Sequence, residues 1–254
     1  MAAIVVYEYR FTPERRRRTA STLQAVLFDM DGTLIDTERS WGAALTALGR
    51  RLGGELSAQA RDATVGTSMP TAVGILHADL GVRRDDSHLL DDGLWVEDAV
   101  AGLLDTDLVW RPGAPDQLRT VRGAAWPTAL VTTTARRLAA PVLERIDGAL
   151  GGPAFDVTVC GDEVPAMKPD PAPYRQAMAA LGVDPAGCVA IEDSLVGVAA
   201  ALAAGAAVLG VPSMQALGPA AGLTLRRSLA GVGLSELSDV LAARDDDLAV
   251  TVRS

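Results

Sequence analysis

Apolar and polar positions along this chain predict strands separated by helices. Short runs of mainly apolar residues predict buried strands at 25–29, 128–132, 157–160, 188–192 and 207–211. Between these runs, apolar residues recur every three or four positions and predict helices at 115–122, 135–150, 171–181 and 195–204. The alternation is typical of an α/β fold with a doubly wound, Rossmann-like parallel sheet.

One long segment interrupts this alternation. Residues 37–108 show helical patterns, at 41–52 and 94–104, but contain no apolar run that predicts a buried strand. We therefore expect a helical cap domain inserted after the first strand, with hinges near 36–40 and 105–112. A cap in this position can close over the edge of the sheet and exclude water.

The insertion divides the chain into three parts. The Rossmann-like core domain is expected to comprise residues 23–36 and 109–254, on either side of the cap at 37–108. We interpret residues 1–22, which contain four consecutive arginines, as a loosely ordered arm.

Acidic residues follow the first predicted strand. Asp29 and Asp31 are two positions apart, so their side chains project to the same side of an extended backbone, and Gly32 allows a sharp turn directly after them. Two carboxylates this close repel each other unless a cation lies between them or a proton is shared. The pair therefore indicates a hard divalent metal with oxygen ligands. Taken alone, the pattern also fits a strand that ends in an acid-rich turn with a helix N-cap.

The only lysine of the chain is a second candidate. Of the 23 basic residues, all but Lys168 are arginine, which indicates that a compact ammonium group is needed at this position rather than a planar guanidinium. Such a point charge suits a phosphate oxygen or a metal-bound carboxylate. Pro169 and Pro171 disfavour a helical backbone before them, so we expect Lys168 to be held in an extended segment. Chance survival of a surface lysine is the alternative.

Two further strand ends carry polar groups. Thr132 begins a run of three threonines whose hydroxyl and backbone N–H groups can hold anionic oxygens at the start of a helix. Glu192 and Asp193 end the fourth predicted strand and suit a metal, although adjacent acids at such a position also commonly cap a helix. Ligands of doubly wound sheets bind outside the carboxyl ends of the strands. We therefore expect these groups to converge with Asp29 and Lys168 on one edge of the sheet.

Composition narrows the possible classes of protein. A formal net charge of −9 over 254 residues argues against the basic face that binding to nucleic acid or to an anionic membrane needs. No apolar stretch approaches the ~20 residues of a membrane span. Cys160 and Cys188 are too far apart to suggest a disulfide framework or a metal site, so we expect a cytoplasmic protein. The acidic residues Asp91 and Asp92, in the predicted cap, are interpreted as solvated charges.

Together the motifs resemble those of the haloacid dehalogenase-like (HAD) hydrolases, in the branch with a helical cap after the first motif. The resemblance spans residues 25 to about 212, and its four motifs occur in the order of the family. They are Asp29-x-Asp31-Gly32-Thr33-Leu34-x-Asp36, Thr132, Lys168-Pro169-x-Pro171, and Glu192-Asp193-Ser194 followed by a helix of small residues. The combination is specific, although each motif alone is not.

The resemblance implies a catalytic role for each of four residues. Asp29 is the implied nucleophile that forms an aspartyl-phosphate, and Asp31 the general acid and then the base. Thr132 and Lys168 are the implied ligands of the transferring phosphoryl group. The remaining substrate contacts are expected from Gly32, Thr33, Thr133, Thr67 and Ser68.

The resemblance also implies a Mg²⁺ cofactor. Its implied ligands are Asp29, the backbone carbonyl of Asp31 and Asp193, with Glu192 in or near the ligand shell. Positioning and charge neutralisation of this kind account for most of phosphoryl-transfer catalysis.

Departures from related branches favour a phosphatase. The acid at Asp31 argues against dehalogenases and phosphate pumps, and the predicted cap has no lysine of the kind that phosphonatases use. Residues 66–68 resemble the β-phosphoglucomutases, but Met69 stands where that branch has an arginine, which weakens the grip on a second phosphate. We therefore expect a magnesium-dependent phosphomonoester hydrolase that acts on a small phosphorylated metabolite, such as a sugar phosphate.

Two alternatives remain open. The chain could be a hexose-phosphate mutase, or a non-catalytic protein that binds a phosphorylated metabolite or a partner through its cap. We expect a monomer or a small homo-oligomer without a nucleic-acid or membrane partner.

Overall fold

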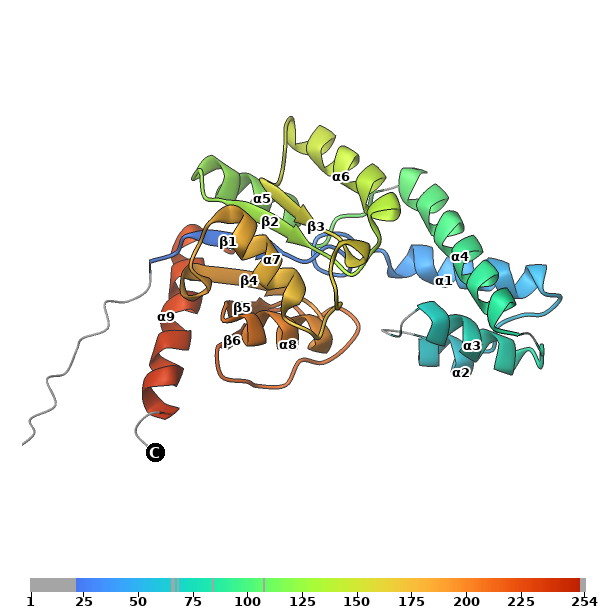
Figure 1. The fold of residues 1–254 in the computed structure, drawn as a ribbon. Helices are drawn as coiled ribbons and strands as arrows, with labels where there is room; N and C mark the ends of the chain where they lie inside the picture. Colours follow the sequence, from blue (N-terminus) through green and yellow to red (C-terminus); the bar gives the residue numbers. More distant parts are fainter. Residues whose placement is uncertain (1–21, 65–66, 68, 84, 107, 252–254) are drawn as a thin grey trace, which may run out of the picture.

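A single parallel sheet organises the chain. The computed structural model describes residues 22–64, 67, 69–83, 85–106 and 108–251, so the predicted arm lies outside the described residues except for its last position. Six strands pair in parallel in the order β3-β2-β1-β4-β5-β6 (Figure 1). They are β1 (Ala25–Phe28), β2 (Thr128–Val131), β3 (Val157–Val159), β4 (Cys188–Glu192), β5 (Ala207–Gly210) and β6 (Leu223–Leu225). The predicted fold class and all five predicted strands are confirmed, and β6 is an additional edge strand.

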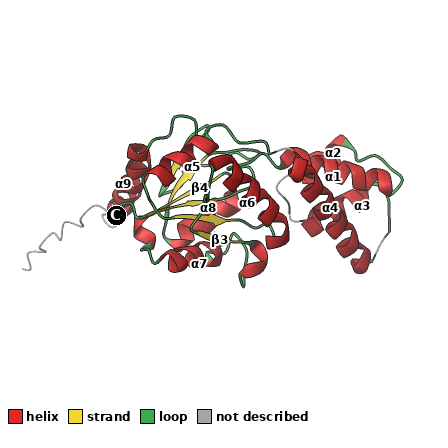
Figure 2. Cartoon of the chain, turned by 90° about the horizontal axis from the view of Figure 1, so that it is seen from above, coloured by secondary structure: helices red, strands yellow, loops and turns green. Residues whose placement is uncertain are grey.

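Helices cover both faces of the sheet, which explains why the strands are apolar throughout. In β1, Val26 and Phe28 belong to one apolar cluster and Ala25 and Leu27 to the other, because successive side chains point to opposite faces. Figure 2 shows the strands enclosed by helices. The first cluster includes residues of α5 (Ala114–Gly123), α6 (Arg136–Leu150) and α9 (Leu234–Thr251), and the second includes residues of α7 (Ala172–Leu181) and α8 (Leu195–Ala204).

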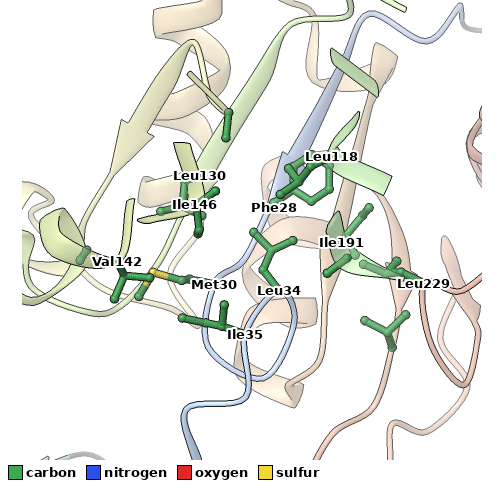
Figure 3. Packing of buried hydrophobic residues seen from close by; sticks show 14 of the residues in the cluster. Phe28, Met30, Leu34, Ile35, Leu118, Leu130, Val142, Ile146, Ile191 and Leu229 are labelled. Atoms are coloured by element: carbon green, nitrogen blue, oxygen red, sulfur yellow. The ribbon is translucent and has the colours of Figure 1, made fainter. Parts of the chain in front are cut away.

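The larger apolar cluster anchors the central strand. Phe28 of β1 and Leu130 of β2 pack with Leu118 of α5 and Ile146 of α6, and all four side chains are fully buried (Figure 3). Complete burial of a large apolar side chain stabilises the fold by about 1.5–3 kcal/mol. This packing therefore fixes the end of β1, and with it the position of Asp29, the next residue of the chain.

Among the described residues between β1 and the rest of the sheet, the chain forms four helices. Helix α1 packs on α4, α2 packs on α3, and α3 packs on α4, whereas α4 also contacts α6. Figures 1 and 2 show this group standing to one side of the sheet. Among the described residues, no helix is long and apolar enough to cross a membrane. The helices are α1 (Glu38–Arg51), α2 (Ala58–Thr64), α3 (Met69–Asp79) and α4 (Asp86–Thr106).

The chain enters and leaves this helical segment through two paired connections. The N–H group of Asp36 donates to the carbonyl of Val109 at 2.8 Å, and the N–H group of Arg111 donates to the carbonyl of Leu34 at 2.8 Å. The two connections therefore run side by side. They lie at the positions where the sequence predicts hinges.

One acidic residue of the helical segment differs from its prediction. Asp92 is only 4% exposed, and its carboxylate lies 2.8 Å from Nε2 of His77, which is also buried. The interpretation of Asp92 as a solvated charge is therefore wrong. Successive residues of a helix point about 100° apart, so the adjacent Asp91 remains exposed while Asp92 faces α3.

Candidate active site

Polar side chains from three neighbouring strands lie together at the carboxyl edge of the sheet. Asp29 and Thr132 directly follow β1 and β2, and Glu192 is the last residue of β4. Because β1 pairs with both β2 and β4 in parallel, the carboxyl ends of these strands are adjacent. Lys168 reaches the same edge from the loop between β3 and α7. All four side chains are buried.

Lys168 connects three elements of the site. Its Nζ donates to Oδ1 of Asp29 at 2.8 Å, to Oε1 of Glu192 at 2.6 Å and to the carbonyl of Val131 at 2.8 Å. Burial alone would lower the pKa of this ammonium group, but the charges of Asp29 and Glu192 outweigh burial and raise the pKa. Lys168 is therefore a fixed positive charge with all three of its hydrogens engaged.

Three carboxylates surround a position suited to a cation. One oxygen from each of Asp29, Glu192 and Asp193 lies within 4.8 Å of the others. The Oδ2 atom of Asp29 is buried and has no hydrogen-bond partner among the described residues, which is costly for a carboxylate oxygen. Burial, followed by the charge of Asp29, raises the pKa of Asp193 to about 7. Crowded oxygens of this kind fit a hard divalent cation.

Glu192 is the most enclosed of these acids. Its Oε1 accepts hydrogen bonds from Lys168 and from the hydroxyl of Tyr174 at 2.6 Å, and its Oε2 accepts one from Ser194 at 3.3 Å. Helix α8 approaches so closely that a Cβ atom at Gly197 would lie 1.9 Å from Oε2. These contacts make Glu192 better suited to hold Lys168 than to contact a cation directly.

The carboxyl group of Asp31 points to another side of the site. Its Oδ2 accepts hydrogen bonds from Oγ1 of Thr134 at 2.7 Å and from Oγ1 of Thr132 at 3.2 Å. Burial, followed by the charge of Asp29, raises the pKa of Asp31. A raised pKa allows a carboxyl group to carry a proton, as a general acid must.

A tight turn after Asp31 supports Asp193. Gly32 adopts a φ of +80°, and a Cβ atom there would lie 2.1 Å from Oδ2 of Asp193. The hydroxyl of Thr33 donates to Oδ1 of Asp193 at 3.5 Å, and the hydroxyl of Ser213 donates to Oδ2. The turn and the segment after β5 thus hold this carboxylate from two directions.

The other expected substrate contacts are more dispersed. Thr133 is exposed, next to Thr132 at the edge of the sheet. Thr67 is exposed between α2 and α3, where its Oγ1 donates to the carbonyl of Thr64 at 2.8 Å. In Figures 1 and 2 these two helices stand away from the strands. Ser68 lies outside the described residues.

Sequence reasoning missed several residues of the site. Tyr174 and Ser213 contact Glu192 and Asp193, but a tyrosine in a helix and a serine in a loop carry no signal of such a role. Thr134 belongs to the run of three threonines after β2, but no local pattern indicates which of their hydroxyls reaches Asp31.

Neither cysteine offers an alternative nucleophile. Cys160 and Cys188 are free thiols and are buried. Burial raises the pKa of Cys160 to about 11 and that of Cys188 to about 12. Neither residue is therefore a thiolate at neutral pH.

The sheet order and the helical segment after β1 define a Rossmann-like α/β protein with a cluster of acids and a lysine at the carboxyl edge of its sheet. The family model of haloacid dehalogenase-like hydrolases matches residues 23–205, and the chain belongs to this family. The resemblance noted from the four motifs is thereby confirmed.

Individual relatives match most of the chain. A phosphoglycolate phosphatase from Chromobacterium violaceum is 30% identical over 222 residues, which cover 86% of this chain and 96% of the relative. Hexitol phosphatase B from Escherichia coli is 29% identical over 230 residues, which cover 88% of this chain and 97% of the relative. The crystal structure of CbbY from Rhodobacter sphaeroides in complex with phosphate has a TM-score of 0.72 and 29% identity, and the match covers 85% of this chain and 99% of that one.

Proposed function

We propose that this protein is a magnesium-dependent phosphatase that hydrolyses small phosphate monoesters through an aspartyl-phosphate on Asp29. The observation that carries the proposal is the hydrogen bonding of the two carboxylate oxygens of Asp29. Lys168 holds Oδ1, while Oδ2 is buried without a hydrogen-bond partner among the described residues. A carboxylate that is fixed by Lys168 and keeps one oxygen without a hydrogen bond is suited to nucleophilic attack. The names of the relatives, phosphoglycolate phosphatase and hexitol phosphatase, support a small phosphorylated substrate.

The first half-reaction transfers the phosphoryl group to the protein. The carboxylate of Asp29 attacks the phosphorus, the bond between phosphorus and the alcohol oxygen breaks, and Asp31 gives its proton to the departing oxygen. Thr132 and Lys168 bind the oxygens of the transferring group and offset its charge. The products of this step are a free alcohol, an aspartyl-phosphate and the carboxylate of Asp31.

The second half-reaction restores the protein. A water oxygen attacks the same phosphorus while the carboxylate of Asp31 takes a proton from the water. The bond between phosphorus and Asp29 breaks, and its electron pair returns to the carboxylate. The sum of both steps converts one ester and one water into one alcohol and one phosphate.

Asp29, Asp193 and the backbone carbonyl of Asp31 are the proposed ligands of Mg²⁺, with Glu192 behind them. When bound, the ion neutralises negative charge on the phosphoryl oxygens and on the nearby carboxylates. The helical segment 37–108 is the proposed cap, and its paired connections to the core are the proposed hinges.

A hydrolysis screen tests the proposed function directly. The purified protein is incubated with Mg²⁺ and a panel of sugar, nucleotide and small-acid phosphates that includes phosphoglycolate and a hexitol phosphate. We expect release of inorganic phosphate from at least one of them. Formation of an isomerised sugar phosphate without phosphate release would favour the mutase alternative, and no turnover at all would favour a binding protein.

We expect the metal-free protein to lose stability as the pH rises. The pKa of Asp193 is raised from 3.8 to about 7 in the folded state. A group whose pKa is higher in the folded than in the unfolded state contributes stability that is complete below about pH 4 and is lost as the pH rises to about 7. In a chelating buffer, the melting temperature of the wild type should therefore fall relative to that of Asp193→Asn over this interval.

Magnesium should reverse this loss. Added Mg²⁺ is expected to raise the melting temperature of the wild type at about pH 8, by mass action on the folded state, and to do so much less in Asp193→Asn. Thermal melting with chelator and with Mg²⁺ measures both effects. A wild-type melting temperature that changes neither with chelator nor with re-added Mg²⁺ would contradict the proposed metal site.

An alanine at Gly32 should remove the metal response and most of the activity. Gly53 provides a matched control, because it also has a positive φ, +90°, but no atom of the described residues, apart from its chain neighbours, lies within 4 Å of a Cβ atom at this position. The left-handed backbone costs an alanine roughly 1–2 kcal/mol at either site. Only Gly32→Ala, however, pushes against Asp193, and a displacement of about 1 Å can lower a rate about 100-fold. Similar kcat/KM values for Gly32→Ala and Gly53→Ala would show that the close contact with Asp193 is unimportant.

A further inference from the structure

We propose that Thr134 is a positioning residue that aims the proton-donating carboxyl group of Asp31 at the departing oxygen of the substrate. The inference rests on the proposed phosphatase function and assigns a task to a residue that belongs to none of the four motifs. It starts from the 2.7 Å hydrogen bond between Oγ1 of Thr134 and Oδ2 of Asp31.

The loop after β2 holds Thr134 rigidly. Its backbone N–H donates to Oγ1 of Thr132 at 3.0 Å, and its carbonyl accepts a hydrogen bond from the N–H group of Gly161 at 3.1 Å. Gly161 fits closely against this loop, because a Cβ atom there would lie 2.1 Å from the carbonyl oxygen of Thr133. The hydroxyl of Thr134 therefore approaches Asp31 from a fixed backbone.

The side chains of Thr132, Thr134 and Thr37 all interact with the carboxyl group of Asp31, and Thr134 makes the shorter of the two hydrogen bonds to Oδ2. Oδ2 of Asp31 accepts from both Thr132 and Thr134 in the structure, and the bond from Thr132 is the longer one at 3.2 Å. A threonine hydroxyl has one hydrogen to donate. If Thr132 donates it to a phosphoryl oxygen, Thr134 continues to hold Oδ2 of Asp31. Oδ1 is then the oxygen that carries the transferable proton.

This role concerns only substrates whose departing oxygen needs a proton. An alkoxide is a poor leaving group and requires a well-placed acid, and general acid catalysis typically contributes about 10²–10⁴-fold to a rate. A dinitrophenolate leaves without a proton, so the orientation of Asp31 should matter little for its departure. The difference between the two substrates separates proton delivery from phosphoryl binding and from general damage to the site.

The experiment compares Thr134→Val and Thr134→Ala, which lack the hydroxyl, with Thr134→Ser, which keeps it. Each variant is assayed on an alkyl phosphate that the wild type hydrolyses, with phosphoglycolate as the first choice, and on dinitrophenyl phosphate. The parameter is kcat/KM, because it reports the steps up to departure of the alcohol and excludes the later hydrolysis of the phosphorylated protein. Thr158→Val, on the adjacent strand β3, is the matched control for the substitution itself.

We expect Thr134→Val and Thr134→Ala to lower kcat/KM for the alkyl phosphate roughly 10- to 100-fold. For dinitrophenyl phosphate we expect a change of less than about threefold, since no acid is needed. Thr134→Ser should restore most of the activity toward the alkyl phosphate, and Thr158→Val should behave as the wild type. Melting curves confirm that at least one variant without the hydroxyl is folded.

Two results would overturn the inference while leaving the proposed function intact. An equal loss on both substrates would mean that Thr134 acts on the phosphoryl group or on the structure of the site, and no loss on either would mean that Asp31 needs no support from Thr134. A wild type that hydrolyses neither substrate would instead refute the proposed function, and the inference with it.

Discussion

Replacing Asp29 with asparagine is expected to abolish turnover while the protein stays folded. An amide cannot attack phosphorus as a carboxylate does, and removal of a catalytic nucleophile can lower kcat by about 10⁶-fold. The amide oxygen of the variant can still accept the hydrogen bond from Lys168, so the melting temperature should change little. Phosphate release and thermal melting measure the two effects.

Two controls make this prediction decisive. Asp91→Asn exchanges an exposed acid of α4 for its amide and should leave kcat/KM unchanged. Acid quenching during turnover should trap a phosphorylated wild-type protein that hydroxylamine dephosphorylates, and it should trap none in Asp29→Asn. Activity in Asp29→Asn, with deamidation excluded by mass spectrometry, would refute the assignment of Asp29 as nucleophile.

Replacing Lys168 with arginine is expected to remove most activity, although the positive charge is kept. The side chain of Lys168 is only 2% exposed, and its ammonium group fills a space bounded by three acceptors at 2.6–2.8 Å. A guanidinium group is longer and planar, and forcing it into this space costs about 1–3 kcal/mol in packing. It would also displace the Asp29 carboxylate, and an error of about 1 Å can lower a rate about 100-fold.

Lys168→Ala should be at least as damaging, because it leaves Glu192 and Asp29 without their positive partner. Breaking a buried ion pair in this way typically costs about 3–5 kcal/mol of stability. Arg119→Lys is the matched control, since it makes the reverse exchange at an exposed ion pair and should leave kcat/KM unaltered. Near wild-type kcat/KM in Lys168→Arg would mean that the choice of lysine at this position is a coincidence.

The parts of the fold with strong local signals were predicted closest to their observed bounds. The strand predicted at 188–192 is β4 (Cys188–Glu192), and the helix predicted at 195–204 is α8 (Leu195–Ala204). Helix α3 (Met69–Asp79) is apolar on most of its surface, so it shows no clear helical period, and β6 (Leu223–Leu225) has only three residues. Neither element carries enough signal in its own residues to be predicted.

In the site, too, local sequence patterns predict some features of single side chains and miss others. The two-residue spacing of Asp29 and Asp31 predicts that both carboxylates face one side, which holds only while the backbone is extended. In the structure β1 ends at Phe28, three residues before Asp31, and the chain turns from Gly32 onward. The carboxyl of Asp31 accepts a hydrogen bond from Thr134 and does not join the acids around Asp29.

The sequence by itself determined the parallel α/β fold, the helical insertion and the residues that converge at the carboxyl edge of the sheet. These features follow from local periodicity and from the positions of polar groups at strand ends, which neighbouring residues encode. Only the tertiary structure decided the partners of those residues, such as Tyr174 for Glu192, Ser213 for Asp193 and Thr134 for Asp31. Asp31 and Thr134 are 103 positions apart. Their contact depends on how turns orient side chains after β1 and β2 pair, which no local pattern records.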